Sequence, residues 1–590
     1  MKGITNSIIL SVLMSLFVWQ NTKGQTSTIE WVKILGTTDD SYKHDNGICI
    51  NAAATLSKNG SLYSVGHFRD TLDFDPNSSQ YNLATFDRTQ SIFITKLSAN
   101  GDLIWAKSLN CTGQSRAFAI EIDDFNNVYV TGKFQDSLDV NPSSNKDNFI
   151  TQGNGNNFIA KFDSNGEFIW SKQFTGKVGK ILLHIDNLNK IWFIGNFTDT
   201  IDFNIGETGY LMTQGSNDVF ISKLDQNGDY LFMKQFGGEY SDIISSIALD
   251  DLGNICLFGK FKGEVDFDPS DAIHKKVAEG EGIFISKLDS EANLIWVKTL
   301  NSNPYIWLAD ISVDGLGNIY TSGSFKLIID LDPSDAVYNL YNYYPTCYPD
   351  AFISKLNASG DFVWAKQFKG GYNLATIESM DVDKKGNIYT MGSFFNDIDF
   401  DPNFYTEHLV RGELHGSMFI CRLNANGTLS WVKHIAGLYS YGHTQGSGDP
   451  IIKVDNFGNV YASGWLLGSG YFGVDEQPSF DMDSHRGERQ EMFNLKISQE
   501  GLADLPEYTL SKDFVVSQNP SNNYVDVYLD HFNRGSISIV DLNGKILHKL
   551  NLEGGLHIYT FPLENYPSGV YLIDVILDGK EMKSKKIIVQ

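Results

Sequence analysis

The chain has 590 residues, of which 42% are hydrophobic and 20% are charged, a balance typical of a globular protein that can bury a large core. Its net charge of −25 repels phosphate backbones and anionic lipid surfaces, so we expect no nucleic acid partner. Aromatic residues make up 13% of the chain and are accompanied by 54 glycines. This composition favours short strands and tight turns, and it predicts an all-β protein.

The N-terminus has the pattern of a secretory signal peptide. Lys2 provides the positive charge, and residues 8–19 form an apolar run that is too short to span a bilayer. Cleavage near Gly24 leaves Gln25 as the first mature residue, so residues 1–24 are predicted to be removed. No later apolar stretch is long enough for a membrane helix, and we expect no stable membrane span.

The five cysteines do not form the pattern of a disulfide framework, because their number is odd and they are spread over hundreds of residues. We therefore expect them to pack as small hydrophobic side chains. They are Cys49, Cys111, Cys256, Cys347 and Cys421.

An internal repeat is the strongest signal in the sequence. A segment like Phe284-Ile285-Ser286-Lys287-Leu288 occurs seven times, and an aromatic residue follows the first six copies at a spacing of twelve residues. Asn-Gly or Ser-Gly turns between them predict a hairpin of fixed length. The phenylalanines that begin the seven copies are Phe93, Phe158, Phe220, Phe284, Phe352, Phe419 and Phe493.

A second motif precedes each hairpin, as in residues 317–323 (G-N-I-Y-T-S-G), and an alternating stretch comes before that motif. Each repeat therefore predicts four strands, which is the content of a propeller blade. The seventh hairpin lacks its last strand, because Pro506 interrupts it, whereas residues 31–34 (W-V-K-I) have the pattern of that strand. We predict a seven-bladed β-propeller over residues 25–505, in which the N-terminal strand closes blade seven.

The antiparallel order of four strands gathers the long, variable connections on one face, including residues 324–350 and 465–490. We expect any ligand to bind on this long-loop face. The repeats resemble the β-propeller repeat of many secreted bacterial proteins over residues 31–500 (G-N-I-Y-x-x-G-x-F … D-F-D-P … F-I-x-K-L … G … W-x-K). This resemblance implies a fold and leaves the function open, because such propellers serve many roles.

The last 80 residues follow a different pattern. Alternating strands are predicted at 524–529, 536–541, 570–577 and 585–589, which favours a small Ig-like β-sandwich over residues 513–590 after a linker at 506–512. The segment resembles the C-terminal sorting domain (type A-like) of the bacterial type IX secretion system, and the resemblance implies that the type IX machinery carries the protein across the outer membrane. The matching residues are Asn519, Pro520, Asn543, Gly544, Lys545, Gly569, Val570 and Tyr571.

The most regular polar feature is an acidic turn, Asp-x-Asp-Pro, which occurs at residues 73–76, 266–269, 330–333 and 399–402. Its alternate carboxylates are possible Ca²⁺ ligands, but calcium needs six to eight oxygens. The alternative is an Asx-type turn in which the carboxylate accepts backbone hydrogen bonds. Softened copies of the turn occur at residues 139–142 (D-V-N-P) and 202–204 (D-F-N). Asp-Ser/Thr-aliphatic precedes the copy at 73–76 and both softened copies (residues 70–72, 136–138 and 199–201), and this pattern resembles the O-glycosylation acceptors of bacteria that use this secretion route.

Three further patterns carry little chemistry. Residues 468–473 (G-S-G-Y-F-G) fit a dinucleotide fingerprint, but no βαβ pattern surrounds them. His408 and His415 are the closest candidate histidine pair. Five tyrosines between 338 and 348 can stack on sugar rings or pack on their own blade.

No residue is assigned a catalytic, cofactor or metal role. We expect an exported propeller that crosses the periplasm of a Gram-negative bacterium and is then secreted or held at the cell surface. We expect it to bind a glycan or a protein without catalysis. The alternatives are a secreted hydrolase or lyase that acts on polysaccharides, and a structural adhesin.

Overall fold

The computed structural model describes most of the chain between Ser27 and Val589. The described residues are 27–36, 48–87, 89–142, 148–151, 155–203, 210–270, 272–301, 305–342, 348–370, 373–402, 408–411, 416–437, 450–467, 469–472, 480–483, 490–499, 515–517, 524–541, 545–563, 566–567, 569–577, 580–581 and 585–589. The predicted signal peptide (1–24) and the predicted linker (506–512) lie outside them.

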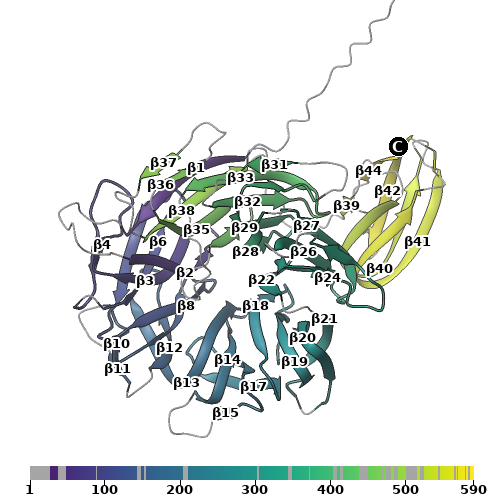
Figure 1. Ribbon diagram of the computed structural model, residues 1–590. Coiled ribbons are helices and arrows are strands. Elements are labelled where there is room, and N and C mark those ends of the chain that lie inside the picture. The colour runs from purple at the N-terminus through teal and green to yellow at the C-terminus, as the bar shows by residue number, and fades with distance from the viewer. Residues whose placement is uncertain are drawn as a thin grey trace, which may run out of the picture. The chain divides into compact units, whose positions relative to one another are not determined.

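The chain divides into two compact units, residues 1–502 and 503–590, which are described separately (Figure 1). The described residues of both units form strands and turns, without a helix, as the composition predicts. No helix of the described part is long and apolar enough to cross a membrane.

Each repeat of the first unit folds into a group of four antiparallel strands, and neighbours in a group are hydrogen-bonded. We number the groups 1 to 7. Group 1 is β2 (Ile48–Leu56), β3 (Leu62–Arg69), β6 (Ser91–Leu97) and β7 (Leu103–Leu109); group 2 is β8 (Ser115–Ile122), β9 (Val128–Phe134), β12 (Asn156–Phe162) and the start of β13 (Phe168–Ile185); group 3 is the rest of β13, β14 (Ile191–Asp202), β16 (Asp218–Leu224) and β17 (Tyr230–Gly238).

The later groups have the same order. Group 4 is β18 (Ile243–Leu249), β19 (Ile255–Asp266), β20 (Lys275–Leu288) and β21 (Leu294–Asn301); group 5 is β22 (Ile306–Val313), β23 (Ile319–Phe325), β26 (Asp350–Leu356) and β27 (Phe362–Phe368); group 6 is β28 (Ala375–Val382), β29 (Ile388–Phe394), β32 (Ser417–Leu423) and β33 (Leu429–Gly437); group 7 is β34 (Ile451–Val454), β35 (Val460–Leu467), β38 (Gln490–Gln499) and β1 (Ser27–Leu35).

Short hairpins occupy the connections between the second and third strands. They are β4 (Thr71–Asp73) with β5 (Asn82–Ala84), β10 (Ser137–Asp139) with β11 (Asn148–Ile150), β14 with β15 (Tyr210–Met212), β24 (Ile328–Asp330) with β25 (Asn339–Tyr341), β30 (Asp397–Asp399) with β31 (Leu409–Arg411), and β36 (Ser469–Phe472) with β37 (Phe480–Asp483). In group 4 the same hairpin is continuous with β19 and β20.

The N-terminal strand β1 takes the place of the fourth strand in group 7. It pairs antiparallel with β38, and Trp31 stands opposite Lys496 just as Trp105 stands opposite Lys96 in group 1. The ring centroids of Trp31 and Tyr461 are 6.3 Å apart, and the Trp31 Nε1–H donates to the carbonyl of Ala99 in group 1 over 3.1 Å. Residues from the two ends of the first unit are therefore paired in one group.

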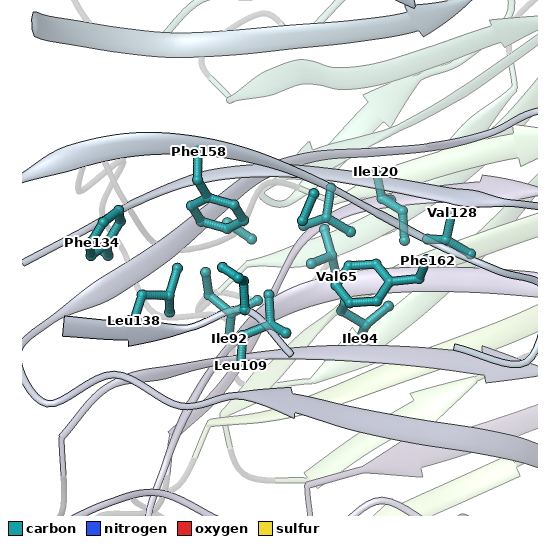
Figure 2. Close-up of a cluster of buried hydrophobic side chains, with 14 of the residues drawn as sticks. Val65, Ile92, Ile94, Leu109, Ile120, Val128, Phe134, Leu138, Phe158 and Phe162 are labelled. Carbon is teal, nitrogen blue, oxygen red and sulfur yellow. The ribbon is translucent and has the colours of Figure 1, made fainter. Parts of the chain in front are cut away.

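The hydrophobic core lies between neighbouring groups. In Figure 2, Val65, Ile92 and Leu109 of group 1 face Phe134 and Phe158 of group 2, and all of these side chains are buried. Similar clusters join the later groups. Because each aromatic or branched side chain contributes roughly 1.5–3 kcal/mol when it is fully buried, the repeats are held together mainly by these shared cores.

A buried carboxylate organises the turn between the first and second strands. In group 5, Asp314 accepts the amides of Leu316 and Asn318 with Oδ1, and Tyr320 donates to its Oδ2 over 3.0 Å. Lys355 lies 3.8 Å from the same oxygen. The equivalent ion pairs are Asp123–Lys161, Asp186–Lys223 and Asp250–Lys287.

The second unit is one antiparallel sheet of six strands around its own core. Its strands are β39 (Val515–Ser517), β40 (Tyr524–Val540), β41 (Ile546–Pro562), β42 (Gly569–Leu577), β43 (Lys580–Glu581) and β44 (Lys585–Val589). The strands predicted at 524–529 and 536–541 are a single strand, β40, which bends at an irregularity between Leu529 and Phe532. The prediction missed β41, which pairs with β40 along almost its whole length.

Candidate functional site

The first strands of all seven groups line one cavity of about 360 Å³. Successive first strands are in contact, from β2 through β8, β13, β18, β22 and β28 to β34, and β34 in turn contacts β2. Figure 1 shows β2, β8, β18, β22 and β28 on the inner side of the first unit. This central cavity is the largest shared feature of the groups and is our candidate site.

One level of the cavity holds most of its chemistry. At this level each first strand contributes the residue that stands two positions before the first residue of the turn. Its partner on the second strand is an aromatic residue in six groups and Cys256 in group 4. In chain order these residues are Thr55, Glu121, His184, Ala248, Ser312, Asp381 and Lys453. The repeat therefore fixes their positions while the residue types vary from group to group.

Glu121 links three groups at this level. Thr55 of group 1 donates to its Oε2 over 2.9 Å, and His184 Nδ1 of group 3 lies 3.6 Å from its Oε1. Burial raises the pKa of Glu121, but its contacts with His184 and the positive charge of Lys453 outweigh burial and lower the pKa below its usual value. Glu121 is therefore ionised at neutral pH and holds the His184 ring in place.

Lys453 of group 7 faces carboxylates from three other groups. Burial lowers the pKa of Lys453, but the charges of Asp381, Glu121 and Asp310 outweigh it and raise the pKa above its usual value. Burial raises the pKa of Asp381, although the amides of Val382 and Val454 donate to its two oxygens over 2.9 Å. The ammonium of Lys453 thus compensates negative charge inside the cavity.

Asp310 of group 5 forms a second bridge across the first strands. Ser246 of group 4 donates to its Oδ1 over 2.5 Å, and its Oδ2 accepts bonds from Ser379 Oγ and the Met380 amide of group 6. The polar side chains of the cavity therefore bind to one another across groups. This arrangement stabilises the ring of first strands, because each bond joins two different groups.

The sequence did not single out Glu121, His184 or Lys453. These residues share one position in the repeat, two residues before the turn carboxylate, a place that Ser57 takes in group 1. Aligning the repeats on that turn makes the shared position visible in the sequence. No group of three or more His, Cys, Asp or Glu side chains suited to a metal ion occurs among the described residues.

The acidic Asp-x-Asp-Pro turns are Asx-type turns. Asp73 Oδ1 accepts the amides of Asp75 and Tyr81, and Asp75 Oδ1 accepts the amide of Asn77. The bonds of Asp73 recur at Asp266, Asp330 and Asp399. These carboxylate oxygens therefore bind backbone amides that the hairpins leave unpaired.

The remaining candidates are dispersed. The Tyr338 ring packs on Phe362 of its own group with 4.8 Å between ring centroids, and its hydroxyl donates to the Ala365 carbonyl. Tyr338 and Tyr341 are both partly exposed, at 41% and 45%. Thr71 and Thr200, within two of the Asp-Ser/Thr motifs, are also exposed. His408 is exposed, and His415, Tyr343, Tyr344 and Cys347 lie outside the described residues; the other four cysteines are buried and form no disulfide.

The pattern at residues 468–473 is part of a hairpin. Its strand β36 pairs with β33 and β37, so it is not the start of a βαβ unit.

In the second unit, the structure describes four of the predicted sorting residues, Lys545, Gly569, Val570 and Tyr571. Tyr571 is buried, and its hydroxyl donates to the Pro567 carbonyl over 2.7 Å. Gly569 and Val570 begin β42, and Lys545, which donates its amide to Asp541 Oδ1, is exposed. Asn519, Pro520, Asn543 and Gly544 lie outside the described residues.

The chain is thus an all-β repeat protein, in which a first unit of repeated four-stranded groups is followed by a small β-domain. Residues 519–590 match the family described as the secretion system C-terminal sorting domain. The chain therefore carries a type IX sorting domain, which implies an interaction with that machinery, and the protein is secreted or held at the cell surface.

A curated relative of this chain is an uncharacterized WD repeat-containing protein of Acanthamoeba polyphaga mimivirus. It is 25% identical over 218 residues, which cover 32% of this chain, and the chain spans only 15% of the length of that relative. This likeness is consistent with a repetitive, propeller-like first unit.

Two solved structures are similar to this chain at low TM-scores. A mutant of the NanB sialidase from Streptococcus pneumoniae is 10% identical, with 78% of this chain and 70% of that chain covered and a TM-score of 0.31. A mutant of the apocarotenoid oxygenase from Synechocystis is 9% identical, with 79% and 93% covered and a TM-score of 0.33. The architecture described above rests on the strand pairing of the chain itself.

Proposed function

We propose that the first unit, over residues 25–505, is a closed seven-bladed β-propeller and that β1 completes its last blade. The pairing of β1 with β38 supports closure, as does the bond from Trp31 to the Ala99 carbonyl of group 1. The contact of β34 with β2 and the shared central cavity further support it. We also propose an Ig-like sandwich over residues 513–590 after a linker at 506–512, in which the one continuous sheet of the described strands folds over its own core.

We further propose that the protein is an exported binding module for a glycan or a protein, and that it uses its long-loop face. The observation that carries this proposal is a set of exposed apolar side chains at equivalent places in four of the hairpins on that face. They are Ile150, Met212, Val277 and Tyr341. If these recurring side chains are contiguous on the face, they form an apolar patch of the kind that marks an interaction surface.

The hydrogen bonding inside the central cavity supports binding rather than catalysis. Glu121 accepts a hydrogen bond from Thr55 with Oε2, and its Oε1 lies beside His184. Asp310 accepts hydrogen bonds from Ser246 and Ser379 with its two oxygens. Carboxylates that hold neighbouring strands together in this way stabilise the ring, and this structural role favours a binding module over an enzyme.

The test uses the full-length mature chain and a panel of soluble and surface polysaccharides, with and without Ca²⁺. Retained protein and released sugar fragments are both measured. We expect retention without release, and we expect the triple variant Ile150→Ser/Met212→Ser/Tyr341→Ser to lose it. Released fragments would contradict the proposal.

A second candidate is an enzyme that acts on polysaccharides in the central cavity, and the Glu121–His184 pair favours it. A carboxylate beside Nδ1 orients an imidazole and leaves Nε2 for proton transfer. If fragments are released, Glu121→Gln should abolish their release without loss of retention, whereas a purely structural pair predicts loss of both.

A further inference from the structure

Basic side chains gather at the long-loop end of the first and second strands in groups 1 to 5. First strands begin at this end and second strands finish there, so the residues concerned are early in a first strand or late in a second strand. We call them the cationic rim, and they are Arg69, Arg116, Lys133, Lys180, Lys262 and Lys326. The rim contrasts with the chain as a whole, which has a net charge of −25.

Two members of the rim are like charges placed side by side. Arg116 of β8 and Lys133 of β9 are Cα partners, so their side chains leave the same side of the sheet. Like charges at directly opposite positions destabilise a pair of strands. The fold does not require them, because the equivalent partners in group 6 are Thr376 and Ser393. Arg116 and Lys133 therefore stand together at a cost to stability.

Most of the rim has no counter-ion within the described part of the chain. Four of its side chains make no ion pair and no hydrogen bond with any residue that the structure describes, and they are Arg69, Lys133, Lys180 and Lys262. By contrast, Lys107 and Lys172 on the outer strands pair with Glu167 and Asp229. The positive charge of the rim is therefore open to an external anion.

A buried histidine lies beside the rim in group 1. His67 is two residues before Arg69 on the same side of β3, is 5% exposed, and has no hydrogen-bond partner for Nδ1 among the described residues. Burial, and then the charges of Arg116 and Arg69, lower the pKa of His67 to about 4, so the positive charge here belongs to the two guanidinium groups. Arg69 Nε is also buried without a partner. Buried polar atoms without partners indicate a place where a hydrogen-bonding ligand can bind.

In groups 4 and 5 the rim stands beside exposed aromatic rings. Lys262 Nζ lies 5.2 Å from the centroid of the Tyr240 ring, and Lys326 Nζ lies 6.0 Å from that of Trp307. Tyr240 and Trp307 are 44% and 48% exposed. A flat ring next to an ammonium group can pack on the apolar face of a sugar while the ammonium group binds an acidic substituent of the same chain.

We propose that the cationic rim binds an acidic polysaccharide, whose carboxylate or sulfate groups lie on the basic side chains and whose sugar rings pack on Tyr240 and Trp307. This inference rests on the proposed function, since it names the ligand of the long-loop face. A guanidinium group holds two oxygens of such an anion with parallel hydrogen bonds. The ligand lies across the rim and not in the central cavity, because carboxylates outnumber ammonium groups in the cavity lining.

The experiment measures affinities in solution, at low and high salt, for the full-length mature chain and three variants. The ligands are polygalacturonate, which carries carboxylates, dextran sulfate, neutral dextran and poly-glutamate. The variants are the rim variant Arg69→Gln/Lys133→Gln/Lys180→Gln, the ring variant Tyr240→Ser/Trp307→Ser, and the control Lys107→Gln/Lys172→Gln/Lys298→Gln. The control removes the same charge from partly exposed ion pairs on the outer strands β7, β13 and β21, which contribute little to stability.

We expect the parent and the control to bind at least one acidic polysaccharide and not dextran. The rim variant should bind it about tenfold more weakly or worse, with a flatter salt dependence. The ring variant should weaken binding of the polysaccharide as well. The thermal midpoint of the rim variant should not fall, because the repulsion between Lys133 and Arg116 is removed.

The proposal is wrong if the parent binds neither acidic polysaccharide, or if the rim variant binds them as well as the parent does. Poly-glutamate that binds as tightly as the polysaccharides, and equally to the ring variant, would assign the rim to an acidic protein segment instead. Retention of dextran alone, lost in Ile150→Ser/Met212→Ser/Tyr341→Ser, would overturn the role of the rim and leave the proposed function in place.

Discussion

Replacing Trp31 tests whether the N-terminal strand closes the first unit. Trp31 is 8% exposed, contacts the Tyr461 ring at 6.3 Å and donates to the Ala99 carbonyl over 3.1 Å. Trp105 in β7 is a matched control, because it is equally buried, contacts Tyr63 at 6.2 Å and donates to the Ser164 carbonyl over 3.1 Å. The main difference between the two tryptophans is that β7 follows its partner strand in sequence and β1 does not.

The expected cost follows from these contacts. A Trp→Ala change in a core costs about 3–5 kcal/mol, which includes the lost hydrogen bond of about 1 kcal/mol. Unfolding entropy of about 2.1 cal/mol/K per residue gives roughly 1 kcal/mol/K for the first unit, so this loss lowers its midpoint by about 3–5 °C. If β1 is docked as the pairing indicates, Trp31→Ala and Trp105→Ala should have similar effects.

The assay is thermal unfolding of the full-length mature chain, followed by circular dichroism at a fixed scan rate. Trp31→Phe should have a smaller effect than Trp31→Ala, because it keeps the aromatic contact and loses only the hydrogen bond. A shift below about 1 °C for Trp31→Ala, together with a shift of several degrees for Trp105→Ala, would refute closure by β1.

Three further predictions concern export and charge. Deletion of residues 519–590 should retain the protein inside the cell, which fractionation and immunoblotting would show, and secretion of the truncated chain would contradict the sorting role. Burial, together with the charges of Arg116 and Arg69, lowers the pKa of His67 from 6.5 to about 4. The unfolded state therefore binds a proton at a higher pH than the folded state does, and the free energy of unfolding falls as the pH drops from 6.5 to about 4. His67→Asn, the residue at the equivalent position in group 3, should flatten this part of a pH–midpoint curve, and an unchanged slope would contradict the argument. Lys453→Met removes the cation that faces Glu121, Asp310 and Asp381. In urea unfolding we expect the free energy of unfolding to fall by roughly 3 kcal/mol at about pH 8 and by less at about pH 5, where the carboxylates are more readily protonated. An equal loss at both pH values would contradict the charge balance.

The repeat was predictable because its residues have structural roles that recur. Phe284 is buried among aromatic neighbours, Trp296 reaches the next group, and Lys287 pairs with Asp250. Each residue type is needed in nearly every copy, so the repeat stands out in a single sequence. The pairing of β1 followed from the same logic, since residues 31–34 have the pattern of a fourth strand without a hairpin before it.

The candidate site was less predictable, because its residues differ from group to group. Glu121, His184 and Lys453 occupy equivalent positions but share no chemistry, and they are brought together only by the ring of first strands. In the second unit, β40 was predicted as two strands because residues 530–535 interrupt the alternation, whereas pairing with β41 carries the strand through them.

The same contrast separates the positions that the fold requires from the positions that it leaves free to vary. The strands of one group are held together by the turn carboxylate, the aromatic residue of the second strand and the lysine of the third strand. That lysine and the tryptophan of the fourth strand also donate to the turn of the next group. The positions without a recurring role are the cavity level, whose contacts between groups differ from strand to strand, the hairpins of the long-loop face and the third residue of each turn. At the third position, turns of one geometry carry Leu252 in group 4 and Lys385 in group 6. The turn geometry therefore leaves this position free to vary, and five of the seven turns carry an apolar residue there.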